Sequence, residues 1–210
     1  MLIVTIFISL KSKKPKAQRL SKEQTHQLII EKADELFRHF GFGKTTVADI
    51  AAELGMSTAN IYKFFPSKDA IIEASGQRNL NEMKENLLRV VQSPKSALER
   101  IEKLVLTVFR LHQDIFRNEK QIYQLVLAAT ERNWACVRNF HDFLLHSMTT
   151  LVEDGMKTGE FRSGDPGATA ETLLDCLNPA LNPLLLRTPN LEMNEEKIQT
   201  LVRFVGKALQ

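Results

Sequence analysis

The polar side chains best able to do chemistry lie within one short stretch, residues 57–63. On a helix their spacing places them on one outward face, with apolar residues behind them. Hydroxyl, amide and ammonium groups form the hydrogen bonds and ion pairs that recognise base edges and phosphates. An asparagine can pair with adenine, a lysine with guanine or a phosphate, and a threonine can contact the thymine methyl group. The polar residues concerned are Ser57, Thr58, Asn60 and Lys63, with Tyr62 at the end of the face, and Ala59 among them is small enough to permit close approach.

Groupings typical of catalysis are absent from the 210-residue sequence. We find no nucleophile elbow, no glycine-rich phosphate loop and no candidate acid–base pair. His141 and His146 are five residues apart, not the four that would place two metal ligands on one helix face. We therefore expect no enzymatic activity, no cofactor and no metal site. A helical enzyme remains the least favoured reading, and turnover of a ligand would identify it.

Two short helices separated by a glycine must position the polar face. The first is capped by Thr45 or Thr46, and Gly55 after it can take the left-handed conformation that ends a helix. Ser57 caps the second helix, which Pro66 ends. This order predicts a helix-turn-helix whose second helix enters the major groove. The apolar wedge between the helices would be Ile50, Leu54, Ile61 and Phe65.

A longer helix comes before this pair and another follows it. Ser21 and Gln24 have the spacing of a capping box, apolar residues recur at helical spacing up to Phe40, and Gly41 ends the pattern. After Pro66, Ser67 caps a helix that runs to about residue 92. The predicted DNA-reading unit would therefore contain three helices. A fourth helix would follow it directly and link it to the rest of the chain.

The remaining sequence also reads as helices. Ser93 and Pro94 resemble a cap and first helical position, and the expected spans are 94–116, 119–131, 133–157, 166–186 and 193–209. Because no stretch alternates with period two, we predict an all-α fold of about nine helices. The expected divisions are an N-terminal arm at 1–20, the reading unit at 21–72 and a helical body at 73–210.

The N-terminal arm has an apolar and a basic part. Residues 1–10 are too short a run to span a bilayer, which needs about 20 apolar residues. Three readings of residues 1–10 remain open: a start placed too far upstream, an extra element packed on the body, and a membrane-surface anchor. The anchor is the least favoured of the three, and we therefore expect no membrane association. Residues 11–22 carry six basic side chains and no acid. They form either an arm that contacts DNA or a solvated tail.

Composition is that of an ordinary globular chain, with 43% hydrophobic and 25% charged residues and a net charge of +3. The two cysteines, Cys136 and Cys176, are far apart and both fall within apolar stretches. We expect both to be small buried hydrophobic residues rather than a disulfide or zinc pair. This use of cysteine suits a cytoplasmic protein.

Residues 28–72 resemble the DNA-binding domain of TetR-type (tetracycline-repressor-like) regulators. The resemblance is carried by Gly41-Phe42-x-x-Thr45-Thr46-Val47-x-Asp49-Ile50-Ala51 and by Gly55-Met56-Ser57-x-x-x-Ile61-Tyr62-x-x-Phe65-Pro66-Ser67-Lys68. It covers about 45 of the 210 residues and is dense. The later helices agree with the family only in number and length. Two positions depart from the family's pattern. They are Leu54, which precedes Gly55, and Asn60, where small residues are more typical.

The resemblance implies roles for individual residues. Thr46 and Lys68 would contact phosphates, and Tyr62 would reach the DNA backbone through its hydroxyl while its ring packs inside. The alternatives are a plain core aromatic for Tyr62 and a solvated surface side chain for Lys68. The expected DNA-binding residues are Thr45, Thr46, Ser57, Thr58, Ala59, Asn60, Tyr62, Lys63 and Lys68.

In this family the helical body responds to a ligand and dimerises, and the resemblance implies both for this chain. Homodimerisation would use the last two helices. Their apolar stripes, Leu173–Leu184 and Ile198–Leu209, could equally be core within one subunit. A small-molecule effector, of a kind that the sequence does not identify, would bind within about 94–157. The candidate lining residues are Phe109, His112, Phe116, Tyr123, Leu127, Trp134 and Phe140.

These observations predict a sequence-specific DNA-binding regulator of transcription. Its expected form is a ligand-responsive repressor that binds a palindromic operator as a dimer, because a two-fold dimer places two reading helices one DNA turn apart. The alternative is an architectural or division-linked DNA-binding protein with no small-molecule effector.

Overall fold

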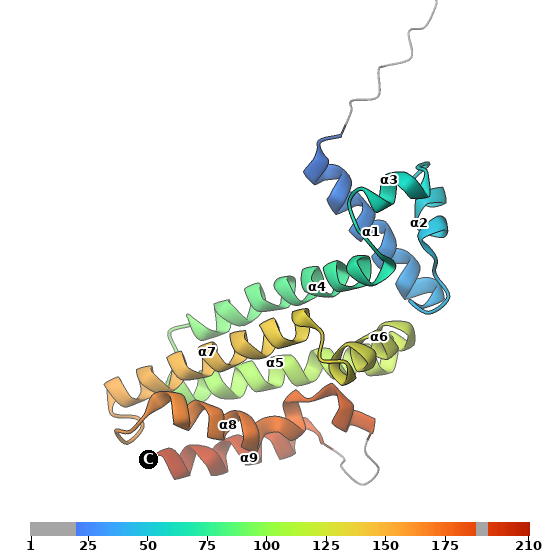
Figure 1. The fold of residues 1–210 in the computed structure, drawn as a ribbon. Coiled ribbons are helices and arrows are strands. Elements are labelled where there is room, and N and C mark those ends of the chain that lie inside the picture. Colours follow the sequence, from blue (N-terminus) through green and yellow to red (C-terminus); the bar gives the residue numbers. More distant parts are fainter. Residues whose placement is uncertain (1–19, 188–192) are drawn as a thin grey trace, which may run out of the picture.

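The structure, a computed structural model, describes residues 20–187 and 193–210, and within these ranges all regular structure is helical. Figure 1 shows a small head of three helices above a larger helical body. The head contains α1 (Lys22–Phe40), α2 (Val47–Glu53) and α3 (Thr58–Tyr62). The long helix α4 (Lys68–Val91) leads from the head into the body. The apolar run at 1–10 and most of the basic stretch at 11–22 lie outside the described residues.

The body contains α5 (Ala97–Asn118), α6 (Lys120–Glu131), α7 (Ala135–Thr158), α8 (Pro166–Leu181), a 3-10 turn at Pro183–Arg187, and α9 (Glu195–Leu209). The all-α expectation is confirmed, and nine α-helices lie within the described ranges. Two boundaries were wrong. The fifth helix is capped by Ser96, not Ser93, because Ser96 and Glu99 form the reciprocal capping box. The eighth ends at Leu181, where Asn182 leaves the helical conformation and the 3-10 turn starts at Pro183.

The caps of the head follow from its sequence. Ser21 Oγ accepts a hydrogen bond from the backbone N–H of Gln24, whose side chain in turn accepts one from the Ser21 N–H at 2.8 Å. Thr46 and Asp49 form the same reciprocal pair at the start of α2. Of the two threonines that could have capped this helix, Thr46 does so. Such caps satisfy helix N–H groups that have no partner within the helix, which fixes where each helix begins.

The described residues form two hydrophobic cores, and α4 contributes to both. Ile71 and Ile72 belong to the head core, whereas Met83 and Leu87 belong to the body core. The head core is not built from the head alone, because Leu125 of α6 is part of it and Trp134 packs against it. The body therefore supports the head directly as well as through the linking helix.

Polar contacts fix the angle between α1 and α4. One oxygen of the Asp34 carboxylate accepts hydrogen bonds from Ser75 Oγ at 2.8 Å and from Asn79 Nδ2 at 2.9 Å. Its other oxygen accepts one from Arg38 Nε at 3.0 Å, and Arg38 also forms an ion pair with Glu119, between α5 and α6. Ser75 is fully buried. Because a buried hydroxyl without a partner is costly, this network strongly favours one packing of the head on α4.

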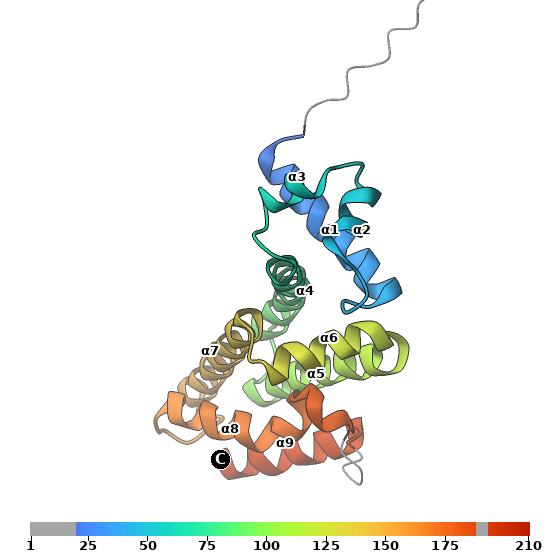
Figure 2. The same ribbon diagram turned by 45° about the vertical axis from the view of Figure 1, so that its right-hand side comes forward.

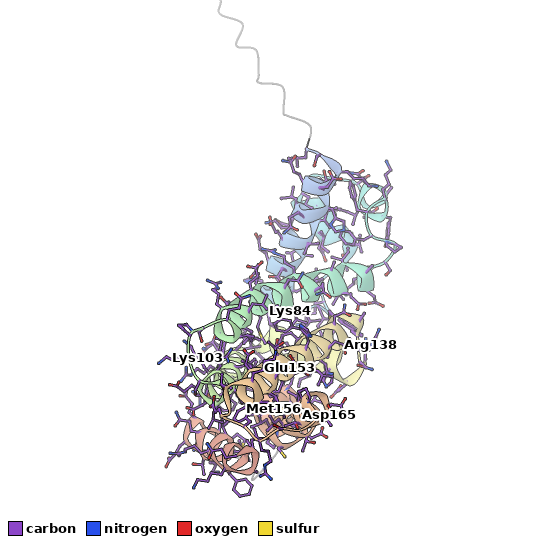
Figure 3. The ribbon with its side chains drawn as sticks, turned by 90° about the vertical axis from the view of Figure 1, so that its left-hand side faces the viewer. Lys84, Lys103, Arg138, Glu153, Met156 and Asp165 are labelled. Carbon is purple, nitrogen blue, oxygen red and sulfur yellow. The ribbon has the colours of Figure 1, made fainter. Side chains whose placement is uncertain are left out.

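Two further polar contacts tie the body together. The carboxylate of Glu160, after α7, accepts hydrogen bonds from the first two N–H groups of α5, those of Ala97 at 2.7 Å and Leu98 at 2.9 Å. Lys84 lies where α4 meets α7 (Figure 3), with its Nζ 3.0 Å from the carbonyl oxygen of Asn139. These contacts tie α4 and α5 to α7 and to the turn that follows it.

The last two helices run side by side in opposite directions beneath α5 and α7 (Figures 1 and 2). Their apolar stripes face inward: Leu173, Leu177, Ile198 and Val202 are all buried in the body core. Cys136 is buried as expected, but Cys176 is exposed, since it falls beside the buried stripe of α8 rather than within it. No helix in 20–187 or 193–210 is long and apolar enough to cross a membrane.

Candidate nucleic-acid interface

The helix-turn-helix expected from the sequence is formed by α2 and α3. Gly55 has φ of +63°, the left-handed conformation that turns the chain between the two helices. Ile50 and Ile61 are fully buried between them, and Phe65 is buried beside them. Leu54, the fourth member of the expected wedge, is only half-buried. The short helix α3 is thus braced on its apolar side and leaves its other side on the surface of the head.

The outward side of α3 carries the side chains that the sequence singled out. Ser57, Thr58, Ala59 and Lys63 are exposed, and Asn60 is half-buried. Ser57 Oγ caps the helix by accepting a hydrogen bond from the Asn60 N–H at 3.2 Å. Small side chains at 58 and 59 allow this surface to approach another molecule closely. The arrangement offers hydroxyl, amide and ammonium groups from one short helix, as the spacing predicted.

Beside this face is an open hollow of about 450 Å³, bounded by the starts of α2, α3 and α4. Three side chains there can bind an anion: the hydroxyl groups of Thr46 and Tyr62 and the ammonium group of Lys68. Tyr62 is 52% exposed, so it is not the plain core aromatic of the alternative reading. The residues around the hollow are Gly43, Thr45, Thr46, Val47, Ala48, Thr58, Tyr62 and Lys68.

Asp49 adds a negative charge near this hollow. Its carboxylate accepts hydrogen bonds from the Thr46 hydroxyl and backbone N–H, both at 2.8 Å. These bonds, together with the nearby charge of Lys68, hold the pKa of Asp49 below its usual range. The carboxylate is therefore ionised at neutral pH, and it orients the Thr46 side chain at the edge of the hollow.

Thr45 is not placed to touch DNA. It is only 2% exposed, and its hydroxyl donates to the carbonyl oxygen of Gly41 at 3.0 Å. Thr45 packs the turn after α1, while Thr46 next to it faces outward. Sequence reasoning could not separate adjacent threonines, because either can cap a helix. Sequence reasoning also missed Gly43 and Ala48, which lie at the hollow. The one feature that could have indicated these two residues is their small size within the segment that resembles the family.

The side chains proposed for an effector do not gather at one place. Phe109, Leu127 and Phe140 are buried, whereas Phe116 is exposed and packs edge-on against Tyr123. Tyr123 donates a hydrogen bond to the carbonyl oxygen of Pro183 at 3.0 Å. Trp134 packs against the head core rather than inside the body.

His112 of α5 differs from these residues. Within the part of the chain that the structure describes, its Nδ1 is the one buried side-chain nitrogen or oxygen atom with no hydrogen-bond partner. Burial lowers the pKa of His112 to about 4, so the ring is neutral at pH 7. Residues 20–187 and 193–210 contain no group of three or more histidine, cysteine or acidic side chains able to hold a metal ion.

Comparison with known proteins gives two family matches along the chain. Residues 29–75 match the family described as bacterial regulatory proteins, tetR family, and residues 97–202 match the tetracyclin repressor-like C-terminal domain. A relative in Bacillus subtilis, the HTH-type transcriptional regulator YhgD, is 23% identical over 154 residues, covering 70% of this chain and 78% of the relative.

Solved structures share this fold over most of the chain. A TetR/AcrR-family regulator from Thermobifida fusca has 24% identity and a TM-score of 0.64, covering 89% of this chain and 98% of its own. The regulator FadR from Bacillus subtilis, solved in complex with stearoyl-CoA, has 13% identity and a TM-score of 0.62, covering 88% of this chain and all of its own. With both family models matched in the same order as the head and body, the chain belongs to the TetR family of DNA-binding transcriptional regulators.

Proposed function

We propose that the protein is a ligand-responsive repressor in the cytoplasm that binds a near-palindromic operator as a homodimer. In this proposal residues 21–72 read DNA and residues 73–210 sense a small molecule and dimerise. The observation that supports it best is the position of the exposed polar face of α3 directly beside an anion-binding hollow. A surface of this kind can contact base edges and the neighbouring phosphates together.

The phosphate contacts would come from Thr46, Tyr62 and Lys68. Their side chains reach the hollow from three elements, so a phosphate there would fix the position of the whole head. Lys68 is also the first residue of α4, whose Ser67 cap leaves other N–H groups of the first turn available. A helix N-terminus attracts an anion, which adds to the charge of the lysine.

The base contacts would come from the outward side of α3. Thr58 and Lys63 are exposed there, and the small residues Ser57 and Ala59 keep the surface low enough to enter the major groove. Asn60 is half-buried, and its side chain has no hydrogen-bond partner within the described residues, so it can turn toward an adenine. Thr45 is left out of the proposed interface.

The effector would bind in the body, among α5, α6 and α7. The neutral, unpaired Nδ1 of His112 is the candidate polar contact there, since a ligand hydrogen bond would satisfy it. FadR from Bacillus subtilis, which shares this fold, is solved in complex with stearoyl-CoA, and this supports a small-molecule effector here. Release of DNA requires the effector to favour the non-binding state, typically by about 1–3 kcal/mol.

Selection of bound fragments from the source genome, followed by a salt titration on the best fragment, tests the proposal. We expect a small set of near-palindromes with half-site centres about 34–36 Å apart, and a steep loss of affinity as salt rises. Many dispersed sites with no shared palindrome would instead favour an architectural role. A screen of small molecules for release of that fragment then tests the effector.

A further inference from the structure

His112 is a polar side chain on an apolar side of the body. It lies in the last two turns of α5, at the end of the body where α5, α6 and the 3-10 turn contact one another (Figure 2). Phe116, one turn further along the same side of α5, packs edge-on against Tyr123 with 4.9 Å between the ring centres. Phe109, about one turn before His112, is fully buried. The imidazole ring thus lies between two aromatic residues along α5.

The two nitrogens of the His112 ring differ in their surroundings. Nδ1 is closed to solvent and has no hydrogen-bond partner among the described residues, whereas Nε2 is not closed off in this way. The pKa of His112 is lowered to about 4 by burial alone, so the ring is neutral at pH 7 and carries one N–H. A buried N–H without a partner is rare in folded proteins. The proton is therefore best placed on Nε2, and Nδ1 keeps a lone pair that can only accept a hydrogen bond.

We propose that the effector is a neutral, mainly apolar molecule that donates one hydrogen bond, from a hydroxyl or amide N–H, to Nδ1 of His112. This inference rests on the proposed ligand response and adds the chemical class of the ligand. The hydrogen bond would satisfy the one buried side-chain nitrogen or oxygen that lacks a partner in the described residues. The apolar part would cover Phe116, which is 42% exposed and lies one turn away. Binding thus removes both an unpaired acceptor and exposed apolar surface.

Charged ligand groups fit this place poorly. A carboxylate or phosphate offers only acceptor oxygens, and its lone pairs would face the lone pair of Nδ1. Among the described residues, no charged side chain contributes to the pKa of His112, so none lies near enough to balance the charge of a ligand. An ammonium group can donate, but a buried charge without a partner costs far more than a buried neutral group. A neutral donor is the class that meets both requirements.

A buried water can also donate to Nδ1, and three probes of similar shape separate the two occupants. They are para-propylphenol, which donates, para-propylanisole, which cannot donate, and para-propylbenzoate, which is a carboxylate. Titration calorimetry on the full chain measures the Kd of each probe, and we expect the phenol to bind and the benzoate not to bind. Nitrogen NMR with isotope-labelled histidine should show Nδ1 of His112 without a proton, and its signal should shift when the phenol is added.

The variant His112→Leu removes the acceptor and keeps an apolar side chain at the same place. One hydrogen bond is worth about 2- to 12-fold in affinity, so the preference for the phenol over the anisole should fall by that factor in this variant. His141→Leu, at an exposed position on α7, is the matched control and should keep the preference of the unaltered protein. Because the NMR measurement uses the unaltered protein, it tests the proposal even if His112→Leu does not fold.

The neutral-donor class is overturned, while a ligand response stands, if Nδ1 of His112 carries the proton or if the benzoate binds as tightly as the phenol. An equal preference for the phenol in His112→Leu and in the unaltered protein overturns it too. If no probe binds and the Nδ1 signal does not move, the site itself is overturned, and any molecule that still releases the operator acts elsewhere. Only a screen in which no molecule releases the operator overturns the ligand response of the proposed function.

Discussion

The carboxylate of Asp34 on α1 accepts a hydrogen bond from the hydroxyl of Ser75 on α4, with 2.8 Å between the two oxygens. This contact joins α1, in the head, to α4, the helix that leads into the body. Ser75 is fully buried, so its hydroxyl has no solvent to replace a lost partner. The angle between the head and α4 therefore depends on a contact between two residues that are 41 positions apart in the chain.

Asp34→Ala should lower the free energy of unfolding by about 1–3 kcal/mol, because it leaves the hydroxyl of Ser75 and the amide of Asn79 without an acceptor. Urea denaturation measures this loss. Glu35→Ala on the same helix is the control, since Glu35 is exposed and its one ion pair within the described residues is with Lys32. It should change stability by less than about 0.5 kcal/mol. Equal losses in the two variants would show that the network does not stabilise the head.

Lys63→Ala should weaken binding to the operator more than binding to random DNA. A side chain that reads a base is worth about 1–3 kcal/mol of discrimination, or about 5- to 150-fold in relative affinity. Fluorescence anisotropy on both DNAs at one salt concentration gives this ratio. An equal loss on both DNAs would assign Lys63 to the phosphate backbone. Lys103→Ala, at an exposed position on α5 of the body, serves as the control for loss of one positive charge.

Tyr62→Phe removes only the hydroxyl group that we place against a phosphate. The expected result is a loss of about 1 kcal/mol, roughly fivefold in affinity, that is the same on the operator and on random DNA. Stability should hardly change, because the ring is half exposed and its hydroxyl has no partner within the protein's described residues. Unchanged affinity on both DNAs would mean that the hydroxyl does not contact the backbone.

His112 predicts a pH dependence of stability. Its pKa lies at about 4 in the folded protein, below the ordinary value of 6.5, so at pH values between the two the unfolded chain binds a proton that the folded chain does not. Stability from this residue is complete above pH 6.5 and is lost as the pH falls toward 4. Urea denaturation at several pH values should show a shallower slope in His112→Gln. The same substitution at exposed His141 should leave the slope as it is.

Deletion of residues 1–19 tests the role of the basic stretch that precedes α1. If it contacts DNA, as its charge suggests, the deletion should weaken binding to every DNA sequence, lessen the salt dependence and leave the sequence preference unchanged. Removal of residues 1–10 alone is the control, since that variant keeps the basic stretch. Affinity that is the same with and without residues 11–19 would make the stretch a solvated tail.

Local signals in the sequence were sufficient for the head. Ser21 with Gln24, Gly55 and Ser57 each act through neighbours within a few residues, and each has the predicted role in the structure. The exposed face of α3 followed from the same helical spacing. These features could be predicted because capping and turn formation depend on atoms close in the chain.

Features that depend on distant partners could not be predicted. Leu125 joins the head core from the body, and Glu160 caps α5 from more than 60 positions away. The residues next to Leu125 and Glu160 in the sequence do not indicate either contact. Ser93 and Ser96 are both good caps, and only the reciprocal bond with Glu99 decides between them. Cys176 looked apolar by its neighbours, but one step around the helix places it on the surface.

The membership of α4 in two cores makes it a lever. The helix is 24 residues long, which at 1.5 Å per residue is about 36 Å. A tilt of about 10° at its body end would carry the other end about 6 Å, nearly two base-pair steps of 3.4 Å each. A rearrangement in the body that is modest in angle would thus displace the head far enough to change its register on the DNA.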